Sequence, residues 1–299
     1  MEKVKEKSSF FRKFVGDKRF YLMVLSIAVP IMVQNGITNF VSLLDNIMIG
    51  RIGTEQMSGA AIVNQLLFVY NLCLFGGVSG AGIFTAQYAG QKDHEGVRQT
   101  FRYKLWLVII LTIITVLLLI SSGEALIGMY LKGEGSAAAL EATSRYGMQY
   151  LWIMLIGLPP FMMVQVYAST LRECGETVLP MKAGIVAVLI NLIFNYLLIY
   201  GKFGFPEMGV RGAAIGTLCA RAAETVMVLV YAIFRNKVVR IRLKDMVKID
   251  KVLLKDFAVY SMPVVLNELM WGLGTSANTA VIGHLGSAAV AANSVAQVA

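Results

Sequence analysis

Polar side chains interrupt several long apolar runs in this sequence, and their types limit the chemistry that they could support. Asp45 and Glu268 are carboxylates among apolar residues, and Asn191 and Asn195 are amides spaced four residues apart. A charged group in hydrocarbon costs about 3 kcal/mol or more unless it is paired, protonated or in contact with water. Residues four apart in a helix share one face. We therefore regard these four residues as candidates for binding a proton or a small cation.

Each of these residues also has a purely structural interpretation. Asp45 could pair with Arg51 at the end of its helix, and Glu268 could bond to Asn267 near the membrane interface. The two asparagine side chains could link neighbouring helices through hydrogen bonds. The residue types alone leave both interpretations open.

The composition indicates an integral membrane protein. Of its 299 residues, 57% are hydrophobic and 15% are charged, and the mean hydropathy is +0.67. Soluble domains carry roughly 25% charged residues, so a soluble protein of this length could not cover so much apolar surface. Three cysteines lie far apart and only two histidines occur, which predicts neither disulfides nor a metal site.

Seven apolar runs predict membrane-spanning helices. A helix needs roughly 20 residues to cross the hydrocarbon core. The runs that reach about this length with at most two charged residues are 20–44, 56–91, 105–123, 146–171, 183–201, 212–234 and 257–283. The predicted fold is an all-α polytopic membrane helix bundle. An eighth apolar segment, 287–299, begins before the sequence ends.

The basic residues predict how the chain is oriented. Cytoplasmic loops retain Lys and Arg, and 21 of these residues fall in the N-terminal tail and every second loop, against 5 in the alternate loops. The prediction is a multi-pass protein with a cytoplasmic N-terminus. The same distribution accounts for the net charge of +9, because basic loops lie against anionic headgroups. We expect membrane lipid and not nucleic acid as the partner of these residues.

The longest basic loop divides the sequence into two parts. We predict an N-terminal six-helix lobe at 1–234, a cytoplasmic basic linker at 235–250 and the start of a second lobe at 251–299. A shift of 233 residues places Pro30 on Pro263, and the six intervening spans would give both copies the same direction. Parallel repeats of this kind occur in secondary transporters. We therefore expect a two-lobe parallel-repeat fold, incomplete after about seven spans, with a C-terminal lobe missing.

Other residues have predicted structural roles. Pro30 and Pro263 each remove a helix hydrogen bond and would permit a hinge. Arg221 and Glu224 are three residues apart, which predicts an ion pair on one helix face. A stripe of small residues predicts close helix packing, and it comprises Gly76, Gly77, Gly80 and Gly82.

One block of sequence is more specific than these patterns. Residues 171–217 read LRECGETVLPMKAGIVAVLINLIFNYLLIYGKFGFPEMGVRGAAIGT, and the first span ends in LLDNIMIGRIG. The LRxxGxTxxPM turn, the NxxxN helix and the YGxFGFPxMGVxGAAIGT loop resemble the multidrug and toxic compound extrusion (MATE) family, over essentially the whole chain. Members have twelve helices in two six-helix lobes. The resemblance implies that this sequence is the N-lobe plus the beginning of the C-lobe.

The resemblance also implies a function and a site. It implies export of organic cations or drugs across the plasma (inner) membrane in exchange for H⁺ or Na⁺, with no further cofactor. Asp45 matches the family's cation-coupling aspartate, and Thr217 matches a hydroxyl that contributes to the ion site in part of the family; Asn191 and Asn195 would join them. Some relatives carry aspartate where Asn195 stands, and this departure favours H⁺. Glu268 lies three residues before the position of a coupling glutamate in many relatives.

Three other interpretations compete with a drug exporter. Residues 77–80 spell the GxSG of intramembrane serine proteases, but that chemistry needs a histidine at membrane depth. His94 lies in a basic loop and His284 at a helix end, so we expect no enzyme activity. A flippase for lipid-linked saccharides, from the same superfamily, would line its cavity with cationic residues, whereas the candidates here are acidic or neutral. A non-transporting membrane scaffold is the third interpretation.

The orientation gives a first testable prediction. A cysteine introduced between Lys237 and Lys248 should be protected from a membrane-impermeant thiol reagent in intact cells, because this loop is predicted to be cytoplasmic. A cysteine introduced near Lys132 should react. The opposite labelling pattern would contradict the predicted orientation.

Overall fold

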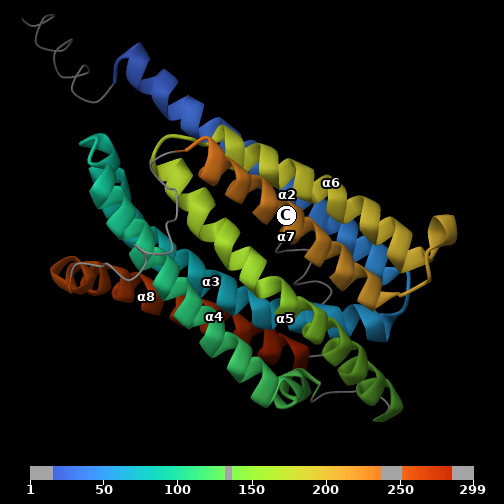
Figure 1. Cartoon of the computed structure of the whole chain (residues 1–299). Coiled ribbons are helices and arrows are strands. Elements are labelled where there is room, and N and C mark those ends of the chain that lie inside the picture. The colour runs from blue at the N-terminus through green and yellow to red at the C-terminus, as the bar shows by residue number, and fades with distance from the viewer. Residues whose placement is uncertain (1–15, 132–136, 237–250, 285–299) are drawn as a thin grey trace, which may run out of the picture.

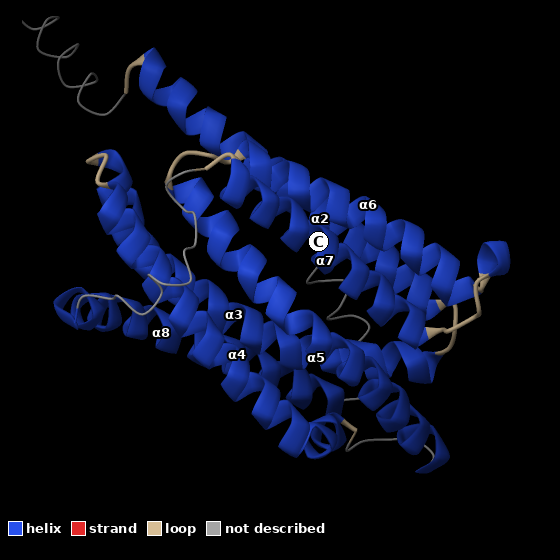
Figure 2. Ribbon diagram, viewed as in Figure 1, coloured by secondary structure: helices blue, strands red, loops and turns tan. Residues whose placement is uncertain are grey.

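The computed structural model describes residues 16–131, 137–236 and 251–284, and within them the chain is helical (Figures 1 and 2). Seven α-helices and one short 3₁₀ helix follow one another without a strand in these described ranges. The elements are α2 Lys18–Gly50, α3 Thr54–Gly90, α4 His94–Tyr130, α5 Ala137–Glu173, α6 Val178–Tyr200, η1 Lys202–Gly204, α7 Val210–Phe234 and α8 Lys251–His284.

The long helix α5 lies between two groups of helices. Helices α2, α6 and α7 pack together on one side of it, and α3, α4 and α8 pack together on the other (Figure 1). Helix α5 touches α7 in the first group and α3 and α4 in the second, while α8 packs chiefly along α3. Side chains on three helices of the first group can therefore meet without crossing α5.

Most helices are longer than the apolar runs that predicted them. The run 105–123 lies inside α4, which begins eleven residues earlier at His94. The Asp93 side chain caps this helix by accepting hydrogen bonds from the backbone N–H groups of Glu95 and Gly96. Charged residues end an apolar run, but they do not end a helix, because their side chains reach water beyond the hydrocarbon. The hydropathy pattern located each span but underestimated the length of its helix.

The prediction of an all-α polytopic membrane bundle is confirmed. Six helices, α2 to α7, are long and apolar enough to cross a membrane. The predicted seventh span, 257–283, forms the 34-residue helix α8, which does not reach the apolarity of the other six within the part of the chain that is described. Its length suffices, but Asn267 and Glu268 interrupt its centre. Helix α8 instead lies against α3 over much of its length.

Glycines set the spacing between helices at several crossings. A Cβ atom on Gly59 of α3 would lie 2.7 Å from the backbone nitrogen of Gly147 on α5. A Cβ on Gly80 would lie 2.7 Å from the Cα of Ser261 on α8, and one on Gly76 would lie 3.0 Å from the Cα of Val265. These contacts are with backbone atoms, which cannot move aside. The predicted role of the α3 stripe in close packing is confirmed by this geometry.

Prolines lie inside three of the helices. Helix α2 continues through Pro30, which has no N–H to give to the carbonyl of Ser26. That carbonyl instead accepts a hydrogen bond from the Thr177 hydroxyl, at 3.3 Å. Pro263 lies inside α8 and its ring is exposed. Sequence analysis did not consider the Pro159–Pro160 pair inside α5. The hinge roles of Pro30 and Pro263 remain predictions.

The close crossing of α3 and α5 gives a second prediction. Gly59→Ala should destabilise the bundle by about 1–3 kcal/mol, because the added methyl group overlaps the α5 backbone. The measurement is the midpoint of thermal unfolding of the purified protein in detergent. Gly128→Ala on α4 is the matched control, since a Cβ there meets no atom within 4 Å. Equal midpoints for the two variants would contradict this account of the crossing.

Candidate functional site

Four of the predicted site residues meet between α2, α6 and α7. The Asn195 Nδ2 group of α6 donates to the Asp45 Oδ1 atom of α2 at 2.7 Å and to the Asn191 Oδ1 atom at 3.3 Å. The Asn191 Nδ2 group donates to the Thr217 Oγ1 atom of α7 at 3.2 Å. Thr217 in turn donates to the Ala213 carbonyl at 3.0 Å. We call Asp45, Asn191, Asn195 and Thr217 the polar cluster.

The polar cluster is enclosed by the three helices. Asn191 and Asn195 are 7% and 1% exposed, and Asp45 and Thr217 are half-buried. Both hydrogens of the Asn195 amide are used, one on the Asp45 carboxylate and one on Asn191. The cluster offers oxygen atoms from a carboxylate, two amides and a hydroxyl, which are the ligand types that hard cations prefer. With a single carboxylate, it could bind a proton or one small monovalent cation.

The glycines of the 201–217 block explain how the cluster is positioned. Gly201 ends α6 in the left-handed conformation, with φ of 62°, and a Cβ on it would lie 2.8 Å from the Glu207 nitrogen. A Cβ on Gly212 would lie 2.6 Å from the Leu198 carbonyl carbon, so α7 approaches the α6 backbone directly. One turn later, a Cβ on Gly216 would overlap the Asn195 side chain. The motif therefore brings α7 close to α6 and leaves room for the Asn195 amide.

Glu268 does not belong to the polar cluster. It lies on α8 against α3, where its Cγ atom would be 3.0 Å from a Cβ on Gly76, and it is within electrostatic range of Cys73. Helix α8 packs on the opposite side of α5 from α2, α6 and α7 (Figure 1). The predicted set thus divides into a group of four residues and a separate carboxylate.

The predicted ion pair between Arg221 and Glu224 is wrong. No nitrogen–oxygen pair of these side chains lies within 4.0 Å, and the ion pairs of the described residues involve other partners. The Arg221 guanidinium lies over the ring of Phe161 on α5, 3.8 Å from its centroid. Such a stack is favourable for a desolvated guanidinium. Helical spacing predicted only a possible neighbour within α7, and the aromatic partner comes from another helix.

Sequence analysis missed a tyrosine that links the cluster to this arginine. The Tyr150 hydroxyl of α5 donates to the Asn64 Oδ1 atom of α3 at 3.3 Å, and the Tyr150 ring is 4% exposed. The hydroxyl lies within electrostatic range of both Asp45 and Arg221. A tyrosine in an apolar span gives no sequence signal of its own, because its hydrogen-bond partner Asn64 is 86 residues away.

Sequence analysis also assigned two basic residues to orientation alone. Lys104 of α4 is fully buried and forms an ion pair with Glu173 at the end of α5. Arg172 donates through Nη2 to the Gln34 Oε1 atom of α2, at 2.9 Å. Both lie at the end of the bundle that is predicted to be cytoplasmic. Their charges count towards the orientation, and their side chains also join helices.

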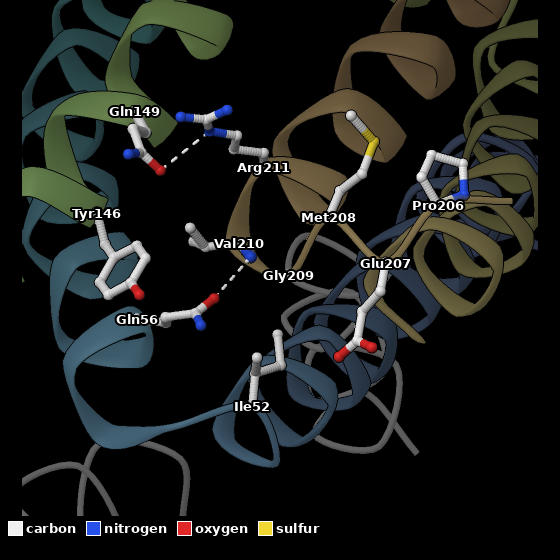
Figure 3. Close-up of a pocket in the computed structure, with 10 residues that line it drawn as sticks. All are labelled: Ile52, Gln56, Tyr146, Gln149, Pro206, Glu207, Met208, Gly209, Val210 and Arg211. Atoms are coloured by element: carbon white, nitrogen blue, oxygen red, sulfur yellow. Dashed lines mark hydrogen bonds between the residues drawn. The ribbon is translucent and has the colours of Figure 1, made fainter. Parts of the chain in front are cut away.

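A pocket of about 550 Å³ lies at the opposite end of the bundle (Figure 3). The α6–α7 loop forms one wall, and the starts of α3 and α5 contribute the facing wall. Gln56 Oε1 accepts a hydrogen bond from the Val210 N–H at 2.9 Å, and Arg211 Nε donates to Gln149 Oε1 at 3.0 Å. These two bonds connect the loop to α3 and α5. The pocket is separate from the polar cluster, with which it shares no residue.

The arrangement can now be compared with known proteins. The family model MatE matches residues 30–197, which is more than half of the chain and includes Asp45, Asn191 and Asn195. The chain belongs to the MatE family. The predicted membership is thereby confirmed, and because members of this family are transporters, the chain is not an enzyme.

Relatives and solved structures agree with this membership. A probable multidrug resistance protein NorM from Thermotoga maritima is 30% identical over 73% of this chain and 46% of its own length. A probable multidrug resistance protein YoeA from Bacillus subtilis is 26% identical over 89% of this chain and 57% of its own. A MOP superfamily transporter from Pyrococcus furiosus has the same fold, with a TM-score of 0.78 at 20% identity over 92% of this chain and 59% of its own. The chain spans about half the length of the curated relatives it matches.

The role of Gly216 gives a third prediction. Gly216→Ala should displace the Asn195 amide and remove the donor of the Asp45 carboxylate, a bond to a charged group worth about 1.5–3 kcal/mol. Loss of that donor favours the protonated carboxyl, so Asp45 should react faster with a hydrophobic carbodiimide at neutral pH. Gly157→Ala is the control, because a Cβ there makes only an ordinary contact, 3.6 Å from Leu218. Unchanged labelling in Gly216→Ala would show that the glycine does not position Asn195.

Proposed function

We propose that this MatE chain forms part of a secondary transporter that exports organic cations or drugs in exchange for H⁺ or Na⁺. The observation that carries the proposal is the 2.7 Å hydrogen bond between Asn195 and Asp45, which joins an intramembrane carboxylate of α2 to α6. The two relatives described above bear the name of probable multidrug resistance proteins. We place the protein in the plasma membrane, with a cytoplasmic N-terminus, on the strength of the basic-residue asymmetry.

In this proposal the charge of Asp45 controls the position of α2. The ionised carboxylate accepts a strong hydrogen bond from Asn195, whereas a neutral carboxyl accepts a weaker one. A cation that binds to Asp45 therefore changes the free energy of holding α2 against α6. Helix α2 can respond by bending at Pro30, which changes the width of the space beside α6 and expels cargo on the outer side. Ion and cargo are coupled because each favours a different position of the same helix.

The coupling ion in this proposal is H⁺. A tight Na⁺ site would gain from a second carboxylate, and Asn195 supplies a neutral amide where some relatives have aspartate. A lone carboxylate with one amide donor is sufficient to bind and release a proton. Glu268 and the Pro263 hinge, on the other side of α5, would belong to a second ion-responsive element in α8.

Two interior arginines favour a second candidate function. Arg221 and Arg172 are half-buried between the helices, and cationic groups there would suit an anionic cargo such as the diphosphate of a lipid-linked saccharide. Each guanidinium already has a partner in this chain, however, since Arg221 lies over Phe161 and Arg172 donates to Gln34. The polar cluster itself is acidic and neutral. Cationic cargo therefore has the stronger support.

The exchange proposal gives a fourth prediction. In intact cells, Asp45→Asn should lower ion-driven efflux of a cationic dye at least about tenfold, within the usual range of coupling energies, and leave dye binding measurable. Efflux is measured under an imposed pH gradient and under an imposed Na⁺ gradient, and only the pH gradient should drive the parent protein. Glu124→Gln, which changes an exposed carboxylate of α4, should match the parent. Efflux by Asp45→Asn at the parental rate would remove Asp45 from the mechanism.

A further inference from the structure

The inner half of α2 has an attachment of its own, separate from the polar cluster. Gln34 accepts a hydrogen bond from Arg172 Nη2 at 2.9 Å. On its other side, the Gln34 Nε2 atom lies 2.6 Å from the position that a Cβ on Gly184 of α6 would take. Gln34 is thus held between an arginine of α5 and a glycine of α6. A change in the position of the Arg172 side chain would therefore alter the hydrogen bond that attaches α2 to α5.

A second contact holds α2 one turn before Pro30. The Ser26 carbonyl, which Pro30 leaves without its helical donor, accepts a hydrogen bond from Thr177 Oγ1 at 3.3 Å. Thr177 lies in the corner between α5 and α6 and is 4% exposed. Arg172 and Thr177 therefore attach α2 to the same corner, on either side of the proline. A movement of this end of α2 away from the corner would have to break both hydrogen bonds.

Glu224 lies beside this attachment and lacks the partners that a buried carboxylate needs. It is half-buried on α7, and within the described residues it has neither a hydrogen-bond donor nor an ion pair. Arg221 on its own helix and Arg172 on α5 are within electrostatic range. Arg221 is stacked on Phe161, whereas the Nε atom of Arg172 is buried without an acceptor. An ionised carboxylate that is partly buried without a hydrogen-bond donor is destabilised by desolvation. A nearby guanidinium with an unused N–H group is the partner that would stabilise it.

We propose that Glu224 is a second proton-binding site of this protein and that its charge decides whether Arg172 holds α2. With a proton on Glu224, Arg172 stays on Gln34, as the structure has it. When that proton passes to water on the inner side, the carboxylate attracts Arg172, and the Arg172–Gln34 hydrogen bond breaks. Of the two polar contacts described above, α2 then keeps only the hydrogen bond from Thr177. Arg172 acts here as a positioning residue.

The surroundings of Glu224 favour this exchange of partners. The charged groups that face it are Arg221 from α7 and Arg172 from α5, and Arg172 also lies within range of Glu173, which is already paired with Lys104. Behind Arg221 lie two tyrosine hydroxyls, from Tyr150 of α5 and Tyr70 of α3. Among these groups, Arg172 is the cation that has an unused N–H group and whose present acceptor, Gln34, is neutral.

This inference deepens the proposed function, on which it rests. Helix α2 would have two attachments, each controlled by one carboxylate: Asp45 through Asn195 in its outer half, and Glu224 through Arg172 and Gln34 in its inner half. Tyr150 lies within electrostatic range of Asp45 and of Arg221, between the two attachments. Loss of the proton from Glu224 would break the Arg172–Gln34 contact, in the half of α2 that does not contain Asp45.

The test measures the attachment directly, in the full chain in membranes. With Cys73, Cys174 and Cys219 replaced by serine, the pair Ser26→Cys and Thr177→Cys reports how closely α2 lies against the α5–α6 corner through its rate of disulfide formation. All rates are first corrected for the intrinsic pH dependence of thiol oxidation. In the Glu224→Gln variant, residue 224 is neutral at every pH, so Arg172 should stay on Gln34 and the disulfide should form fast at every pH. Without that substitution, cross-linking should slow at least about fivefold relative to Glu224→Gln as pH rises.

Matched variants make the outcome specific. Glu124→Gln should behave as the protein with native Glu224, and Arg172→Met should cross-link slowly at every pH, because Gln34 has lost its donor. If Glu224→Gln fails to accumulate, Gln34→Leu replaces it and should remove the pH dependence by deleting the acceptor. The same pH dependence with and without Glu224, or none in the parent pair, would overturn the inference.

Efflux separates this inference from the function on which it rests. If Asp45→Asn abolishes efflux while Glu224→Gln keeps the parental pH profile, the exchange proposal stands and the role of Glu224 is rejected. If the parent protein shows no ion-driven efflux but cross-linking depends on Glu224 and pH, the exchange proposal fails and the proton site stands. The expected result is that Glu224→Gln flattens the pH profile of efflux and Glu124→Gln does not.

Discussion

The hydrogen bond from Asn195 to Asp45 is the contact on which the rest of the arrangement depends. A carboxylate in a lipid-facing bundle has no bulk water to stabilise it, so its donor must come from another helix. Asn195 is 1% exposed and supplies that donor at 2.7 Å. Gly212 lets α7 lie directly on α6, and Gly216 leaves the room that the Asn195 amide occupies. The carboxylate, the amide pair and the glycine spacing therefore act as one unit.

The same principle operates, with different residues, at the end of the bundle that is predicted to be cytoplasmic. Lys104 is fully buried and paired with Glu173, and Arg172 reaches across to Gln34. These side chains replace water as partners for charges that the hydrocarbon would not tolerate alone. Helices α2, α4 and α5 are thereby joined by polar contacts at this end of the bundle. The two halves of α2 differ in the group that binds them, since an amide binds Asp45 and a guanidinium binds Gln34.

Local sequence patterns predicted the helices and the pairing of Asn191 with Asn195, because both depend on short-range spacing, whereas Thr217 was expected from the family resemblance. The apolar runs located every span, and the four-residue interval of Asn191 and Asn195 predicted a shared face, which the structure places against Asp45 and Thr217. Long-range packing set what the patterns could not predict. Glu268 lies apart because α8 packs on α3, and the stack of Arg221 on Phe161 joins residues 60 positions apart. Tyr150 and Arg172 were overlooked for the same reason.

The glycines of α3 have a consequence for how the chain is made. Gly76 and Gly80 leave a notch in α3 that Val265 and Ser261 of α8 fill, and these partners are translated about 180 residues later. At a rate of roughly 5–20 residues per second, α3 spends on the order of ten seconds or more in the bilayer with the notch open to lipid or to other helices. During biosynthesis, the early bundle therefore exposes a helix-sized binding surface.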